Sequence, residues 1–301
     1  MGQHGAVRTK ILALVALVTV GTLTLPTAAQ ARSRPSSPTY YVSLGDSYSV
    51  GLQPGLGSTP GYTVYVAART HLKLVNFGCN DATTTSILDV VGCPAVLPHT
   101  IGGVTYPTTT QIAAADAFIT AHQRHIGLIT VSIGGNDVTE CAKQSNVIGC
   151  VAGVLKSIRT NVTTLASDLR TAAGPKVPII GLTYPDVILG VYVYPAQPPA
   201  PALVNLAKES VAAFKLLINP ALSKAYASSS GAFVDVTAAT GAYTSLTRTV
   251  KTKAFGTIPV AVASVCALTW FCAQGNIHAR TPGYTLIGKL VVARYNAIRR
   301  R

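Results

Sequence analysis

The chain has 301 residues, 49% of them hydrophobic, and a formal net charge of +14 at pH 7, because 24 Lys and Arg outweigh ten Asp and Glu. This length suits one α/β domain behind a leader. The charge does not indicate a nucleic-acid-binding protein, because the basic residues are not interleaved with aromatic ones and the leader indicates export. The basic cluster between 251 and 301 predicts a solvated helix face, in preference to a surface that contacts an anionic cell envelope.

The N-terminus has the layout of a secretory signal peptide. Arg8 and Lys10 precede an apolar run at 11–25, and Ala29 and Ala31 are the small residues that a signal peptidase needs. The run has roughly 15 residues against the roughly 20 of a membrane-spanning helix, so we favour cleavage over a retained anchor. The sequence therefore predicts a secreted protein with a signal peptide at 1–31, a Pro/Ser linker at 32–38 and one domain at 39–301.

Strand-like and helix-like segments follow the linker. Apolar, β-branched runs predict strands at 39–44, 72–77, 126–133, 177–183 and 232–236, and helical patterns cover 110–125, 154–173, 202–228 and 281–300. Continuous apolar strands separated by helices indicate a parallel sheet that is covered on both faces. With right-handed crossovers, this gives an α/β fold, a doubly wound parallel sheet in three layers.

Four short motifs fall on one rim of that sheet. Gly-Asp-Ser-Tyr at 45–48, Phe-Gly-Cys-Asn-Asp-Ala-Thr-Thr at 77–84 and Gly-Gly-Asn-Asp at 134–137 each follow one of the first three strands. Gly-Asn-Ile-His at 275–278 comes just before the last helix. Ligands of such sheets bind outside the carboxyl ends of the strands, so this agreement predicts a functional site there.

Ser47 and Asn136 have the residue types and settings of an acyl-transfer site. Gly45 permits a tight bend before Ser47, which would expose its hydroxyl as a nucleophile next to backbone N–H groups. The Asn136 amide can donate to an oxyanion. The structural alternatives are a helix N-cap at Ser47 and a turn with positive φ at Gly-Gly-Asn-Asp, in which Asp137 serves as a hydrogen-bond acceptor.

His278 is the candidate general base. The other histidines lie in the leader, on the 110–125 helix or in polar connections, whereas His278 precedes a helix that starts at Thr281 and Pro282 and can lean over the strand ends. After the fourth strand, the candidates for an apolar wall near the site are Tyr184, Tyr192, Tyr194 and Pro195; the alternative is that they only pack their own loop.

Six cysteines in an exported chain indicate disulfides, and sequence alone allows fifteen pairings. Their grouping favours the sequential bridges Cys79–Cys93, Cys141–Cys150 and Cys266–Cys272. A metal site is the rival interpretation, but no pair has two-residue spacing and no histidine lies close to one.

The rim motifs resemble the blocks of the SGNH, or GDSL, hydrolase family. Ser47 matches the first block, Asn136 the third and His278 the fourth, over nearly the whole mature chain, and the cysteine pairs resemble the secreted actinobacterial esterases and lipases. The resemblance implies a flavodoxin-like sheet and hydrolysis of carboxylic esters through an acyl-serine. It also implies an oxyanion hole built by the Ser47 N–H, a block-two N–H and the Asn136 amide, with no cofactor and no metal.

Two positions depart from the family pattern. Asp81 stands where related sequences carry a block-two Gly; its backbone N–H can still donate if Asp81 adopts the same conformation, whereas its carboxylate would repel an oxyanion unless it turned toward Thr83 or Thr84. Gly78 is the less favoured stand-in. The family's acid is also missing before His278. We expect the backbone carbonyl of Gly275 or Gln274 to orient the ring, as in a Ser-His dyad, with the Asn276 oxygen as second choice.

The sequence thus predicts a secreted, monomeric serine esterase or lipase that acts on small-molecule or lipid esters. The alternative is a catalytically weakened relative that binds acylated envelope glycans or lipids.

Overall fold

Five parallel strands form the central sheet of the computed structural model, which describes residues 1–2 and 39–300. They are β1 Tyr40–Gly45, β4 Lys73–Asn76, β5 Ile126–Ser132, β6 Ile179–Leu182 and β7 Ala232–Val234. The strand order is β4-β1-β5-β6-β7, and each neighbouring pair is parallel. This is the flavodoxin-like order, with its switch point between β1 and β5, so the predicted fold class is confirmed.

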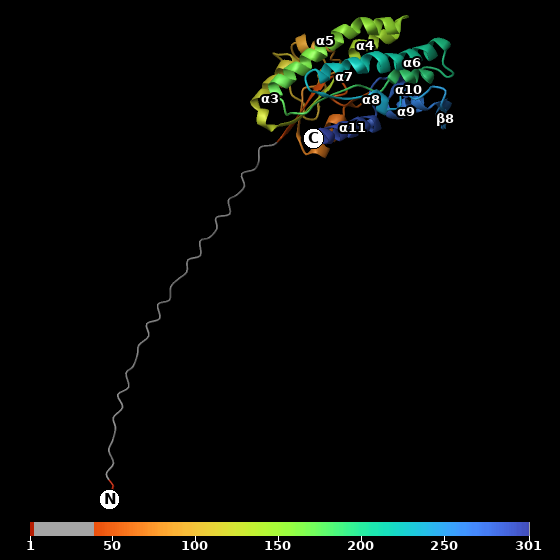
Figure 1. The fold of residues 1–301 in the computed structure, drawn as a ribbon. Helices are drawn as coiled ribbons and strands as arrows, with labels where there is room; N and C mark the ends of the chain where they lie inside the picture. Colours follow the sequence, from red (N-terminus) through yellow and green to blue (C-terminus); the bar gives the residue numbers. More distant parts are fainter. Residues whose placement is uncertain (3–38, 301) are drawn as a thin grey trace. The chain divides into compact units, whose positions relative to one another are not determined.

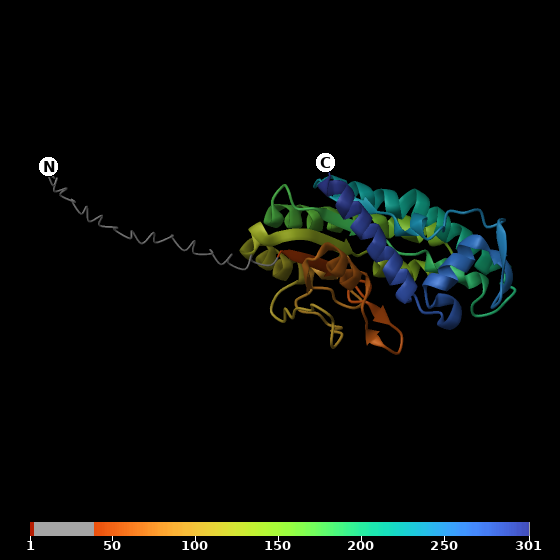
Figure 2. The ribbon, with the colours of Figure 1, turned by 90° about the horizontal axis from the view of Figure 1, so that it is seen from below.

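Helices cover both faces because successive strand residues point to opposite sides of the sheet. Val42 and Leu44 belong to an apolar cluster with residues of α3 Gln111–Ala121, α5 Val147–Ala173 and α7 Asn219–Ala227. Figure 1 shows these three helices on the same side of the molecule. Tyr41 and Leu128 pack on the other face under α1 Tyr62–Thr70 and α11 Thr281–Arg299, the orange and dark blue helices that lie side by side in Figure 2.

A third apolar cluster forms beyond the carboxyl ends of the strands. It joins η3 Val187–Tyr192, α6 Pro201–Ala213 and α9 Val260–Leu268. The remaining elements are short: the hairpins β2 Leu52–Gln53 with β3 Gly57–Ser58 and β8 Thr249–Thr252 with β9 Gly256–Pro259, the helices α2 Ser86–Asp89, α4 Gly135–Thr139, α8 Val236–Ala239 and α10 Phe271–Gln274, and the turns η1 Gln123–His125, η2 Glu140–Lys143 and η4 Phe214–Ile218.

Two helices differ from the sequence prediction. α5 begins at Val147 instead of 154, because the Asn146 side chain accepts a hydrogen bond from the Gly149 N–H (2.8 Å) and caps about two additional turns. The pattern at 202–228 is not one α-helix: η4 is a π-helical turn between α6 and α7. Pro220 lacks the N–H of a regular helix, and the widened turn accommodates it.

The predicted signal peptide at 1–31 and linker at 32–38 lie outside the described residues, apart from Met1 and Gly2. Among the helices of the described residues, none combines the length and the apolar character that crossing a membrane requires.

Candidate functional site

Ser47 lies in a tight turn at the end of β1 that other residues hold in place. Gly45 has φ +134°, and a Cβ there would lie 2.2 Å from the Ser132 carbonyl oxygen, so only glycine fits. Asp46 accepts hydrogen bonds from the Tyr48 N–H (3.0 Å) and the Tyr184 hydroxyl (2.5 Å). Within the described residues, neither the hydroxyl nor the backbone N–H of Ser47 makes a hydrogen bond. Residues 46–50 form a turn and not a helix, so Ser47 is not a helix N-cap, and its hydroxyl and N–H are not used by the fold.

Asp81 has a left-handed backbone conformation. Its φ of +61° lies in the left-handed region, which Asp tolerates better than most residues. Its backbone N–H has no acceptor among the described residues, whereas the Gly78 N–H donates to Asn76 Oδ1 (3.0 Å). Asp81 is thus the available backbone donor, and Gly78 is not.

Asn136 lies at the start of α4, just after Gly134 with its φ of +103°. Its Nδ2 donates to the Ala82 carbonyl (2.9 Å), which leaves a second amide proton free for a ligand. Asp137 accepts from the Thr84 N–H (2.9 Å) and the Thr84 hydroxyl (2.5 Å), so it is a structural acceptor, as the sequence suggests. These hydrogen bonds connect the loop after β4 to the segment after β5.

The Asp81 carboxylate does not turn toward its neighbouring threonines. Thr84 donates both of its protons to Asp137, and the Thr83 N–H donates to Ser86 Oγ (2.8 Å). The expectation that Thr83 or Thr84 could hold the carboxylate is therefore wrong. The Asp81 side chain is exposed to solvent instead.

The Asn276 side chain contacts the imidazole ring of His278. Asn276 Oδ1 accepts from the His278 backbone N–H (3.0 Å) and lies 2.8 Å from His278 Nδ1. A backbone N–H can only donate, so the amide atom that faces it must be the oxygen. The same oxygen faces Nδ1, which must then carry the proton and leave the Nε2 lone pair free. The preference for the carbonyl of Gly275 or Gln274 is wrong; the second candidate, Asn276, makes the contact.

The loop that carries His278 is anchored from both sides. The Trp270 N–H donates to the His278 carbonyl (3.0 Å), and the Tyr48 hydroxyl donates to the Ile277 carbonyl (2.7 Å). Tyr48 follows Ser47 directly, and its ring centroid lies 6.1 Å from that of His278. The turn that carries Ser47 and the loop that carries His278 are thereby brought together, although no hydrogen bond joins Ser47 to His278 within the described residues. Sequence reasoning missed Tyr48, because nothing in the motif marks a contact between residues so far apart.

Burial keeps His278 neutral. Desolvation lowers the pKa of His278 to about 4, and the negative charge of Asp81 opposes that shift by raising it. At neutral pH the ring is therefore unprotonated and able to accept a proton on Nε2.

Ser47 and Asn136 open onto an apolar cavity of about 90 Å³. Its walls come from α4, η2, α5, η3, α6 and η4, and they include Val138, Val151, Ile188, Leu206 and Phe214. Tyr184 lines it as expected. Tyr192, Tyr194 and Pro195 are not among the lining residues; Tyr194 instead packs against Phe271, at 6.2 Å between ring centroids.

The three sequential disulfides form as predicted. Cys79–Cys93, Cys141–Cys150 and Cys266–Cys272 have Cα separations of 5.5, 5.5 and 5.1 Å. All six sulfurs are therefore bonded in pairs, which removes them as thiolate metal ligands. Two bridges adjoin the site: Cys79 precedes the Asp81 turn, and Cys272 precedes the His278 loop.

No family model and no curated protein matches this chain. Among solved structures, a lipase (Lip_vut3) from a goat rumen metagenome has a TM-score of 0.51 at 14% identity, covering 85% of this chain and 96% of that one. A phospholipase A1 from Streptomyces albidoflavus scores 0.42 at 20% identity (68% and 82% covered), and an extracellular lipase from Streptomyces rimosus 0.44 at 19% (66% and 81%). The chain shares its fold with the rumen lipase; the two Streptomyces scores are too low to add to this.

Proposed function

We propose that this chain is a secreted serine esterase or lipase of the SGNH type, with Ser47 as nucleophile and His278 as general base. The observation that carries the proposal is the pairing of unused groups at one cavity mouth. Within the described residues, no hydrogen bond is made by the Ser47 hydroxyl, by the Ser47 N–H or by one of the two Asn136 amide protons. The adjoining loop carries His278, which is neutral and has its proton on Nδ1. Acyl transfer needs each of these groups.

The proposed reaction runs in two steps. His278 Nε2 takes the proton of the Ser47 hydroxyl while Ser47 Oγ forms a bond to the ester carbonyl carbon. The carbonyl oxygen becomes an oxyanion that accepts from the N–H groups of Ser47 and Asp81 and from the Asn136 amide. The intermediate collapses, the bond to the alcohol breaks, and imidazolium returns its proton to the alcohol oxygen. Water then attacks the acyl-serine by the same route and releases the carboxylic acid.

Export supports the same interpretation. The leader pattern at 1–31 and three disulfides suit an oxidising, extracellular location. No step of the proposed reaction needs a cofactor.

A fluorophosphonate reagent tests the proposal, because it phosphonylates only a serine that a neighbouring base activates. We expect one covalent adduct, on the peptide that contains Ser47, and none after heat unfolding. An unlabelled but folded protein would support the alternative, a relative that binds acylated glycans or lipids without hydrolysing them.

Asn136→Ala is expected to lower kcat by about 10²–10³-fold and to change KM little, because its amide would bind the oxyanion that exists only after attack. Steady-state kinetics on a p-nitrophenyl ester measure both constants. Asn161→Ala is the matched control. Asn161 donates to Thr84 Oγ1 (3.1 Å) in the loop after β4, but it does not line the cavity. A KM effect alone in Asn136→Ala would assign Asn136 to ground-state binding instead.

Asp81→Asn is expected to move the acidic limb of the kcat/KM profile to lower pH. The Asp81 charge raises the pKa of His278, so its removal lets burial lower that pKa further, and the base stays unprotonated in more acidic solution. Asn keeps the left-handed backbone and its N–H. Asp89→Asn, an exposed carboxylate in the same connection, should leave the limb in place. If the acidic limb of the kcat/KM profile stays in place in Asp81→Asn, the charge of Asp81 does not affect the pKa of His278.

A further inference from the structure

We infer that the apolar cavity beside Ser47 is the acyl-binding site and that it selects straight acyl chains of about four to six carbons. The inference rests on the proposed function, because it assigns the two halves of an ester to the two sides of Ser47.

The assignment follows from which groups line the cavity. The alcohol oxygen of an ester must lie beside the base, because imidazolium returns its proton there. Ser47 and Asn136 line the cavity, whereas neither His278 nor Asp81 does. The alcohol therefore lies outside the cavity on the histidine side, and the acyl chain points into it.

The cavity interior offers no free polar group to a substituted chain. The Tyr184 hydroxyl is taken by Asp46, and the Ser210 hydroxyl donates to the buried carboxylate of Asp186 (2.9 Å). The Tyr48 hydroxyl donates to the Ile277 carbonyl (2.7 Å), and the Thr139 hydroxyl donates to the Gly135 carbonyl (2.9 Å). Most of the remaining walls are aliphatic or aromatic, including Val138, Val147 and Phe214. A hydroxylated or charged acyl chain would lose its hydration without compensation, so an unsubstituted hydrocarbon fits best.

Its size sets a ceiling on chain length. About 90 Å³ is well below the roughly 150 Å³ of an engineered cavity that holds benzene, so only a few carbons beyond the carbonyl fit. Phe214 and Ile218 of the π-helical turn η4 contribute to the walls. Within the ceiling, each buried methylene is expected to raise kcat/KM by up to about fourfold.

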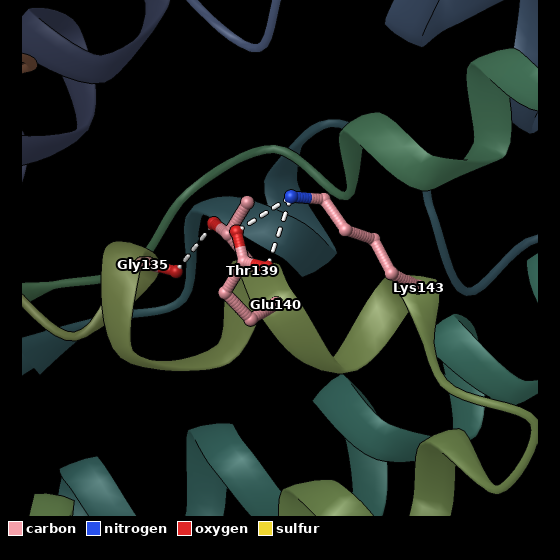
Figure 3. A network of polar contacts seen from close by, with 4 residues as sticks. All are labelled: Gly135, Thr139, Glu140 and Lys143. Atoms are coloured by element: carbon pink, nitrogen blue, oxygen red, sulfur yellow. Dashed lines mark hydrogen bonds and ion pairs between the residues drawn. The ribbon is translucent and has the colours of Figure 1, made fainter.

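A disulfide joins two of the segments that line the cavity. Thr139, Cys141 and Ala142 of α4 and η2 line the cavity together with Val147 and Val151 of α5, and the Cys141–Cys150 bridge joins the two. Figure 3 shows the polar contacts of this segment, where Lys143 pairs with Glu140 (2.7 Å) and the Thr139 hydroxyl donates to the Gly135 carbonyl (2.9 Å). The ion pair is exposed and contributes little, so the disulfide is the fixed element of this wall.

Hydrolysis rates across p-nitrophenyl esters from acetate to dodecanoate test the inference. In the parent, kcat/KM should rise from acetate to a maximum between butanoate and hexanoate and then fall. Ala142→Leu should fill the cavity and lower the hexanoate-to-acetate ratio of kcat/KM at least tenfold. Ala152→Leu is the matched control, an exposed alanine on α5, and should keep the parent ratio.

Phe214→Ala removes a side chain from the cavity wall instead of adding one, and it tests the acyl assignment even if Ala142→Leu fails to fold. It should enlarge the cavity and raise the decanoate-to-hexanoate ratio at least fivefold. A flat chain-length profile, or ratios that both variants leave unchanged while the esters are hydrolysed, would overturn the acyl assignment alone. Failure of the parent to hydrolyse any ester, together with failure of fluorophosphonate labelling, would overturn the proposed function and this inference with it.

Discussion

Ser47→Ala is expected to abolish ester hydrolysis, with kcat falling by up to about 10⁶-fold as for other activated serine nucleophiles, while the thermal unfolding midpoint stays within a degree or two. The reason is that the Ser47 hydroxyl makes no hydrogen bond within the described residues, so its removal costs the fold nothing. Kinetics on a p-nitrophenyl ester and a thermal melt measure the two effects.

Ser49→Ala, two residues along, gives the contrasting result. Ser49 is fully buried and its hydroxyl donates to the Asp46 carbonyl (2.6 Å), so the variant should lose about 1 kcal/mol of stability. Activity in Ser47→Ala above a tenth of the parent's would remove Ser47 as the nucleophile.

Asn276→Ala should lower kcat/KM by about 10²-fold or more, because the Nδ1 proton loses its acceptor and general-base catalysis contributes about 10²–10⁴-fold. Asn276→Asp should restore most of the activity. It keeps an oxygen at the same place, fixes the same tautomer and adds a charge that stabilises imidazolium. Gln274→Ala changes an exposed side chain at the end of α10, two residues before Asn276, and should behave like the parent.

The pH profile separates orientation from simple loss of structure. A carboxylate beside the ring favours its protonated form, so Asn276→Asp should raise the pKa of His278 from about 4 and move the acidic limb to higher pH. Nitrogen-15 shifts of the parent should show the proton on Nδ1. Full activity in Asn276→Ala would return the orienting role to a backbone carbonyl.

Local pattern was enough for the sheet and for the rim on which the site lies. Apolar, β-branched strand runs bury on both faces of a parallel sheet whatever packs against them, and the residue after each strand must then lie at its carboxyl edge. Pattern was not enough for α1 and α9. Their β-branched residues do not favour a helix, and burial of Tyr62 and Val66 against α11 outweighs that preference in α1.

The sequence by itself determined the strands of the sheet and the rim that holds Ser47, Asn136 and His278, because these depend on periodicity along the chain. It favoured the three sequential disulfides, and the structure contains them. Only the tertiary structure decided which atom contacts His278 and where an acyl chain can lie. Asn276 reaches the ring because the Tyr48 hydroxyl and the Trp270 N–H hold the loop backbone from outside it. The cavity likewise exists only where α4 and α5 meet η3, α6 and η4, and packing between such distant segments leaves no mark on local sequence.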